Sequence, residues 1–86
     1  MKAIHKHNLL TIDRQCVMLP ANAEVLTVQT QNGEPCLWVM ADINQPLEQK
    51  AIAIYATGQD LPSSAGKYIG TYMMAGDSLG FHVFEV

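Results

Sequence analysis

The sequence predicts an all-β protein, with about seven short antiparallel strands that form a small sandwich or an open barrel. Glycine and proline interrupt the chain at short intervals, and the runs between them are rich in Val, Ile, Thr and Tyr, which fit a pleated sheet. The 86 residues, 49% apolar and 15% charged, form one domain that spans residues 1–86. The predicted strands are Ala3–Asn8, Leu10–Met18, Glu24–Gln31, Cys36–Asp42, Ala51–Thr57, Lys67–Met74 and Leu79–Val86.

Residue alternation separates half-buried strands from central ones. The second predicted strand has a mainly apolar face, which is typical of a strand that buries that face; it consists of Leu10, Ile12, Arg14, Cys16 and Met18. The third strand places Leu26 and Val28 together in the same way. By contrast, the segments CLWVMA and FHVFEV are apolar on both faces, so we expect them to be the central strands.

Three short segments predict turns. Asn32-Gly33 is the strongest hairpin signal, because both residues accept the positive φ of a primed turn. Gly76 has the same role in residues 75–78, and Pro20 places a turn at residues 19–23. Residues 43–50 are predicted to be loop, with a single helical turn after Pro46 as the alternative.

The longest segment without a strand pattern is TGQDLPSSAG, residues 57–66, and long structured loops often carry binding sites. Its hydroxyls, glycine amides and one ammonium suit a small anion or a nucleotide, while the nearby tyrosines suit a base or a protein partner. Tyr68 and Tyr72 are expected to share a strand face, with Gly70 between them. The candidate partner- or ligand-binding residues are Tyr55, Thr57, Gly58, Gln59, Ser63, Ser64, Lys67, Tyr68 and Tyr72.

Two plainer interpretations of these residues stay open. Residues 57–66 also fit a solvated connector between two strands, and the tyrosines with Trp38 also fit an ordinary aromatic core cluster. The sequence alone does not separate these alternatives from a binding site.

No catalytic or metal site is predicted. His5 and His7 would share a strand face and could supply two zinc ligands, with His82, Cys16 or Asp13 as further ligands. Nothing in the sequence brings these ligands together, and a terminal strand readily carries exposed histidines, so this plainer interpretation is favoured. Cys36 lacks the helix N-terminus that would stabilise a thiolate, so Cys36 and His82 are predicted to be interior residues rather than a nucleophile and its base. We therefore expect no enzyme activity and no cofactor.

Charge and composition restrict the partners. Five basic residues against eight acidic ones give a net charge of −3, and the basic residues are scattered, which argues against duplex DNA or RNA. No signal peptide and no run of about 20 apolar residues is present, so we expect a cytoplasmic protein without a membrane partner.

The hydrophobic core of so small a domain supplies only about 3–5 kcal/mol of stability, so a homo-oligomer is expected. Cys16 and Cys36 are predicted to be reduced and mostly buried.

Several segments, taken in order, are similar to those of a family of short proteins encoded by bacteriophages and prophages and described as a domain of unknown function. These segments, which together span nearly the whole chain, are DRQ at 13–15, QNGEPCLW at 31–38, IYATG at 54–58, YIGTY at 68–72 and the C-terminal FHVFEV. Members of that family tend to have glycine–threonine–glycine–histidine where this chain has Ala56-Thr57-Gly58-Gln59. If that histidine serves a reaction in them, Gln59 argues against an enzyme here.

The resemblance implies a phage accessory protein that acts inside the infected bacterium. Small proteins of this origin often counter host defence, so we expect a protein that binds a host effector, for example as an anti-CRISPR-type inhibitor. Two alternatives are an oligomeric sponge that sequesters a nucleotide immune signal and a phage structural or assembly protein.

Overall fold

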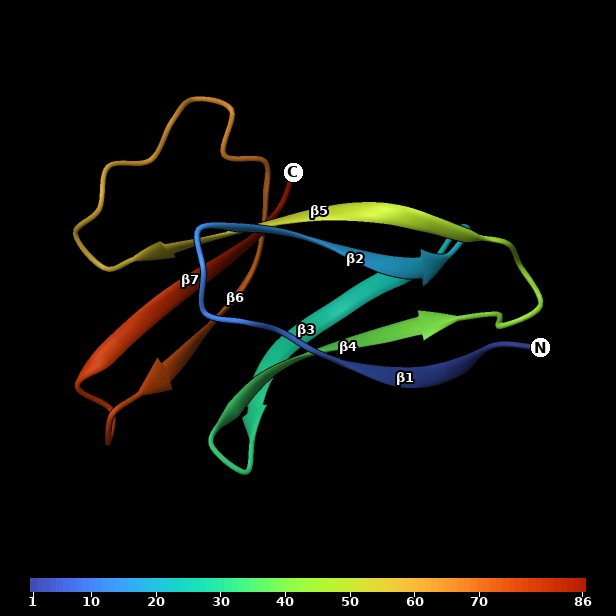
Figure 1. Ribbon diagram of the computed structural model, residues 1–86, viewed down its shortest axis with the longest axis horizontal. Helices are drawn as coiled ribbons and strands as arrows, with labels where there is room; N and C mark the ends of the chain where they lie inside the picture. The colour runs from blue at the N-terminus through green and yellow to red at the C-terminus, as the bar shows by residue number, and fades with distance from the viewer.

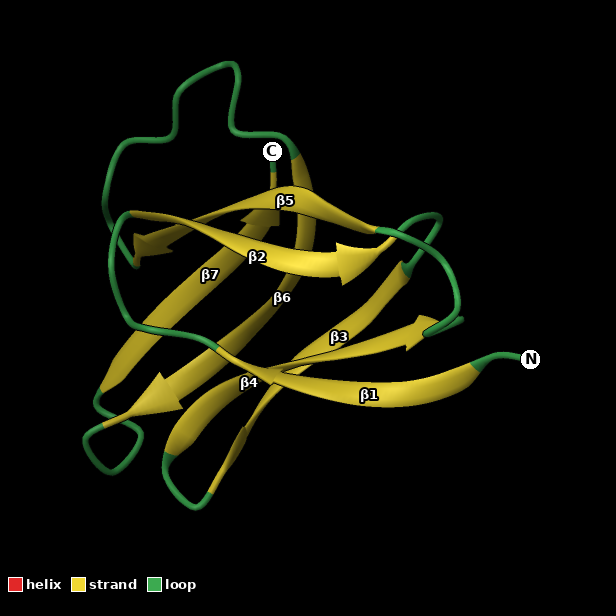
Figure 2. Cartoon of the chain, turned by 45° about the vertical axis from the view of Figure 1, so that its right-hand side comes forward, coloured by secondary structure: helices red, strands yellow, loops and turns green.

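A computed structural model describes residues 1–86, and its only regular elements are seven antiparallel strands in two sheets (Figure 1), as predicted. One sheet has the order β1-β4-β3, and the other has the order β2-β5-β7-β6. The two sheets pack as a sandwich and do not close into a barrel (Figure 2). The strands are β1 (Ala3–Asn8), β2 (Arg14–Pro20), β3 (Glu24–Gln31), β4 (Glu34–Ala41), β5 (Leu47–Ala56), β6 (Lys67–Met74) and β7 (Leu79–Glu85).

The hydrophobic core lies between the sheets. Each strand turns alternate side chains inward, and the core cluster is made of Leu9, Leu19, Val28, Leu37, Val39, Ala41, Ile52, Ile54, Tyr72 and Val83. β4 and β7 are hydrogen-bonded on both sides, which confirms that the segments CLWVMA and FHVFEV belong to central strands. β3 and β6 contact each other across the sandwich, where an added Cβ on Gly70 would lie 2.9 Å from Val28 Cγ1. The absence of a side chain at Gly70 therefore permits this close approach.

The second strand differs from its prediction in extent and in orientation. It begins at Arg14 rather than Leu10. Its inward side chains are the partly buried Val17 and the buried Leu19, while Cys16 and Met18 are exposed. Pro20 is the last strand residue instead of part of the turn, which follows at residues 21–22. A proline is tolerated there because β2 is an edge strand.

Two β-bulges change which side chains share a face. A register shift between Val25 and Thr27 leaves Leu26 41% exposed, although Val28 is in the core. A second shift lies between Tyr68 and Gly70; as a result Tyr68 is 55% exposed and Tyr72 is 3% exposed. Leu26 and Val28 were predicted to share one face of their strand, and Tyr68 and Tyr72 one face of theirs. Both predictions are therefore wrong.

Some predicted boundaries also need correction. β5 begins at Leu47, so the second half of residues 43–50 is strand rather than loop or helix. β4 begins at Glu34 instead of Cys36, directly after the Asn32-Gly33 turn, whose φ angles of 53° and 79° confirm the predicted hairpin. β5 ends at Ala56, β4 at Ala41 and β7 at Glu85, each one residue before its predicted end.

Candidate functional site

A hollow of about 310 Å³ lies on the outer face of the four-stranded sheet, between that face and the first half of the 57–66 loop. We call it the Tyr68 hollow. In Figure 1 the loop leaves the end of β5, runs outside both sheets and returns to the start of β6. The residues that line the hollow are Tyr55, Ala56, Thr57, Gly58, Gln59, Leu61, Tyr68, His82 and Phe84.

Three aromatic rings form one wall of the Tyr68 hollow. The register of β5, β7 and β6 pairs Tyr55 with His82 and Phe84 with Tyr68, which brings these side chains to one face. The Phe84 ring centroid lies 5.6 Å from that of Tyr55, at an interplanar angle of 82°, and 5.6 Å from that of Tyr68, at 65°. Such edge-to-face contacts fix the rings relative to one another. The bulge at Ile69 turns Tyr68 outward into this group.

A chain of hydrogen bonds runs beside the rings and joins the start of the 57–66 loop to β7 and β6. His82 Nε2 lies 2.7 Å from Thr57 Oγ1, and His82 Nδ1 lies 2.8 Å from Thr71 Oγ1. Thr71 Oγ1 in turn lies 2.6 Å from the hydroxyl oxygen of Tyr68. Both ring nitrogens of the half-buried His82 therefore have hydroxyl partners, and the Tyr68 ring is held at both its apolar and its polar end.

The 57–66 loop packs onto the sheet at both of its ends. Its first residue, Thr57, donates its backbone N–H to the carbonyl oxygen of Gly80 over 3.1 Å. Near its other end, Ala65 is 8% exposed and forms a small cluster with Ala53, Tyr55 and Phe84. The loop is therefore attached to the sheet at both ends, while its other residues are exposed, so both the connector and the binding-site interpretation stay predictions.

The backbone at Gly66 excludes any larger residue there. Its φ is +97°, and an added Cβ would lie 2.3 Å from the carbonyl oxygen of Glu85. Glycine thus allows the chain to pass directly over the end of β7 before it enters β6.

The structure brings together five of the nine residues that the sequence singles out: Tyr55, Thr57, Gly58, Gln59 and Tyr68. Ser63, Ser64 and Lys67 lie outside the lining of the Tyr68 hollow. Tyr72 belongs to the core, where its ring stacks on Phe81 with centroids 5.5 Å apart. Burial raises the pKa of the Tyr72 hydroxyl, and its 2.8 Å hydrogen bond with Thr11 Oγ1 opposes that rise.

Sequence reasoning missed His82 and Phe84 as lining residues. Their spacing of two in a strand was the available signal, because it places both side chains on one face. Leu61 and Ala56 were also missed, and no pattern in the sequence marks them.

The other polar groups that the sequence raises lie elsewhere. His5 and His7 are half-buried on β1; desolvation, and then the charge of His5, lower the pKa of His7. His5 Nε2 is buried and has no hydrogen-bond partner. No group of three His, Cys, Asp or Glu side chains is close enough to hold a metal ion. Cys36 lies on β4 in the three-stranded sheet, and His82 lies on β7 in the four-stranded sheet. The two residues are therefore not cross-strand neighbours, as a nucleophile and its base on adjacent strands would be.

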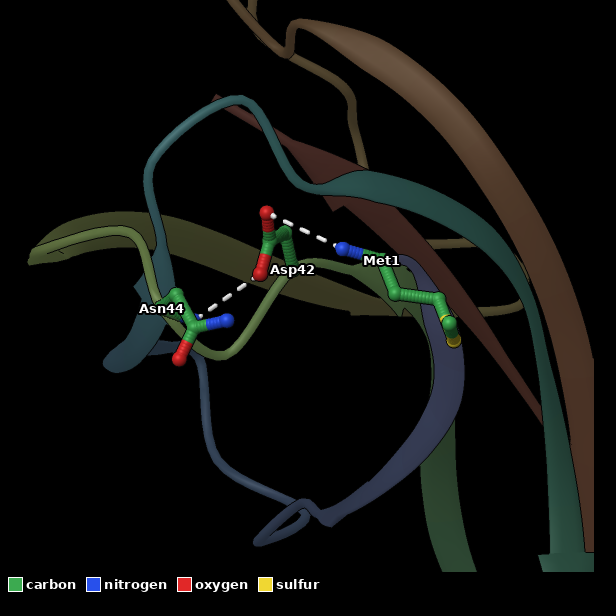
Figure 3. A network of polar contacts seen from close by, with 3 residues as sticks. All are labelled: Met1, Asp42 and Asn44. Atoms are coloured by element: carbon green, nitrogen blue, oxygen red, sulfur yellow. Dashed lines mark hydrogen bonds and ion pairs between the residues drawn. The ribbon is translucent and has the colours of Figure 1, made fainter.

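One polar network closes the end of the sandwich near the N-terminus (Figure 3). Asp42 Oδ1 accepts a 3.0 Å hydrogen bond from the Asn44 backbone N–H, and Asp42 Oδ2 lies 3.6 Å from the Met1 amino group. The Asn44 hydrogen bond is the main reason that the pKa of Asp42 is lowered, with the Met1 charge adding to it. Through these two contacts Asp42 joins the turn after β4 to the start of the chain.

The outer face of the four-stranded sheet exposes apolar side chains beyond the Tyr68 hollow. Met18 on β2, Met73 on β6 and the terminal Val86 are 47%, 42% and 45% exposed. Cys16, which was predicted to be buried, is exposed on the same face because β2 turns Val17 and Leu19 inward instead. Cys36 is buried and, like Cys16, is a free thiol.

The structure contains no helix that is long and apolar enough to cross a membrane.

Comparison with known proteins identifies a family and no characterised relative. No curated protein and no solved structure matches the chain significantly. One family model does match, and it covers residues 1–86. The chain therefore belongs to the family described as a domain of unknown function, DUF7352.

Proposed function

We propose that this protein is a phage-encoded accessory protein that acts in the bacterial cytoplasm by binding a host effector protein, as an anti-CRISPR-type inhibitor does, and not by catalysis. The observation that supports this most is the state of Tyr68. Its ring is 55% exposed, yet Phe84 and Thr71 hold it in place. An exposed aromatic residue that is already immobilised loses little entropy on binding, and such residues dominate protein–protein interfaces.

The surface around Tyr68 fits the same function. A sheet face that stays in water normally carries polar residues, whereas this one exposes Met18, Met73 and Val86. These side chains are spread over the face, with Met18 and Met73 at its opposite corners, so a partner that covers Tyr68 contacts only part of this set. The same face can also bury area between copies of this chain, so we propose that the free protein is a homo-oligomer.

Capture from a bacterial lysate, followed by reconstitution, tests this proposal. Tagged wild-type protein should enrich a host protein that then forms a stable complex when both are purified. Tyr68→Ala should weaken that complex by at least about tenfold, which is the effect of losing a hot-spot side chain. Ile4→Ala is the matched control, since Ile4 is 62% exposed on β1, which belongs to the other sheet. Equal binding by wild type and Tyr68→Ala would refute the role of this face.

A second candidate function is sequestration of a nucleotide immune signal, and the Tyr68 hollow is the observation that favours it. Thermal unfolding with a panel of cyclic nucleotides tests it, because a ligand that binds only the native state raises Tm. A Tm that no nucleotide changes would exclude this function. A structural role in the phage would instead place the protein in purified particles, where mass spectrometry would detect it.

A further inference from the structure

We propose that the Tyr68 hollow is a subsite for a neutral planar ring of the nucleobase type, recognised by one acceptor and one donor at the edge of an aromatic wall. This inference rests on the second candidate function and deepens it, because it names the part of a ligand that this site recognises. It is independent of the host-protein proposal.

We assign the directions of the hydrogen bonds around His82 from the number of protons available, beginning at Thr57. Thr57 Oγ1 donates its single proton to the carbonyl oxygen of Gly80, over 3.3 Å, so it accepts the proton of His82 Nε2. A neutral imidazole with its proton on Nε2 presents Nδ1 as an acceptor, and Thr71 donates to that atom. Having used its only proton, Thr71 Oγ1 accepts the hydroxyl proton of Tyr68.

The hydroxyl oxygen of Tyr68 is therefore left with accepting lone pairs. The side chain is 55% exposed and lines the hollow, and in this proposal its oxygen accepts a ligand N–H. Gln59 supplies the opposite group. Its Oε1 accepts a 3.0 Å hydrogen bond from the Ala56 N–H, which leaves the amide Nε2 as a donor. The lining of the hollow thus includes one acceptor and one donor, the two kinds of group with which the edge of a nucleobase forms hydrogen bonds.

Size and wall chemistry indicate a single ring system. A volume of about 310 Å³ is at the lower end of the range for small-molecule pockets. The exposed ring of Tyr68 supplies π surface of the kind on which bases stack, and the buried Tyr55 and half-buried Phe84 support it from behind. A base or a nucleoside therefore fits the hollow better than a dinucleotide.

The charges around the hollow argue that the ring, and not a phosphate, is the recognised part. No Lys or Arg is among the lining residues, and Ser63, Ser64 and Lys67 all lie outside them. Phosphate binding needs a cation or converging backbone N–H groups. We therefore expect that adding a phosphate to the ligand does not strengthen binding.

Titration of 15N-labelled protein with adenosine, guanosine and uridine, followed by NMR, tests the proposal. We expect saturable shifts at Gly58, Gln59, Tyr68 and His82 for at least one nucleoside, with its 5′-monophosphate binding no more tightly. Tyr68→Phe keeps the ring but removes the acceptor, so it should weaken binding roughly two- to tenfold. Tyr68→Ala should abolish the shifts, whereas Ile4→Ala, on β1 of the other sheet, should bind as wild type does.

The outcomes separate this inference from the function on which it rests. If nucleotides bind but perturb Lys67, Ser63 and Ser64 instead of the hollow, the inference is wrong and nucleotide sequestration stands. If neither nucleosides nor nucleotides bind to the folded protein, then the proposed base subsite and the proposed nucleotide sequestration are both wrong. The direction of the hydrogen bonds from Thr57 to Tyr68 can be checked separately. Long-range 15N–1H correlations should show that the proton of the neutral His82 ring is on Nε2. A proton on Nδ1 would reverse the chain and overturn the proposed acceptor.

Discussion

His82 Nε2 lies 2.7 Å from Thr57 Oγ1, so the central strand β7 holds the first residue of the 57–66 loop. Thr57 is tied to the same strand again through its backbone N–H and the Gly80 carbonyl. An added Cβ on Gly80 would lie 2.9 Å from Thr57 Oγ1, so the loop enters close against β7. This attachment positions the rim of the Tyr68 hollow.

Thr57→Val should lower the free energy of unfolding by about 0.5–1.5 kcal/mol, because the half-buried His82 Nε2 loses its hydroxyl partner. Urea unfolding followed by circular dichroism measures this. Thr57→Ser retains the hydroxyl and should remain close to wild type. If the two variants were equally stable, the hydrogen bond would contribute nothing.

Gly70→Ala should cost about 1–3 kcal/mol, because the new Cβ overlaps Val28 Cγ1 where β6 approaches β3. Gly70 carries no positive φ, so no backbone strain adds to this cost. Combining it with Val28→Ala tests the cause. The double variant should be less destabilised than the sum of the single variants, and strict additivity would show that the overlap is not the reason.

Gly33→Val should lower the free energy of unfolding without weakening the binding of a partner by the folded protein. Gly33 has a φ of +79° and no atom within 4 Å of an added Cβ, so the cost comes from the backbone alone. Thermal unfolding should show a lower Tm, while capture of a host partner below that Tm should equal that of wild type. A fully stable Gly33→Val that loses binding would place the QNGEPCLW hairpin in the functional surface instead.

Stability should decrease as the pH falls through the ordinary pKa of histidine, in part because of His7. Burial lowers the pKa of His7 in the folded state below 6.5, so the unfolded chain takes up the proton first. The contribution is fully present above about pH 6.5 and is lost as the pH falls toward the lowered folded value. His7→Gln should give a flatter stability profile between about pH 7 and 5 in urea titrations. An unchanged slope would contradict the assignment to His7.

A thiol reagent should modify one cysteine in the folded protein. Cys16 is exposed, whereas Cys36 is 1% exposed and donates a 3.4 Å hydrogen bond to Asn8 Oδ1. Ellman's reagent should therefore titrate one thiol under native conditions and both in denaturant. Cys16→Ser should remove the native reaction, and a native signal that persists in this variant would show that Cys36 becomes accessible by local opening.

The sequence by itself determined the class of fold and much of its layout. Strand-forming residues between glycine and proline turns predict local extended structure, and the φ preferences of Asn32-Gly33 act within the hairpin they form. The two segments that are apolar on both faces could be assigned to central strands, β4 and β7, because burial on both sides requires apolar residues in sequence. Five lining residues of the Tyr68 hollow were identified, because an unusually long loop next to tyrosines is visible in the sequence alone.

Only the tertiary structure decided which face of each strand is buried. Alternation along β2 defines two faces, but the opposite sheet selects Val17 and Leu19 for the core and leaves Cys16 and Met18 outside. A bulge adds one residue and reverses every side chain beyond it, and at Ile69 it separates Tyr68 from Tyr72. His82 and Phe84 join the site for a similar reason, since contact between strands distant in sequence depends on register, which only the assembled sheet specifies.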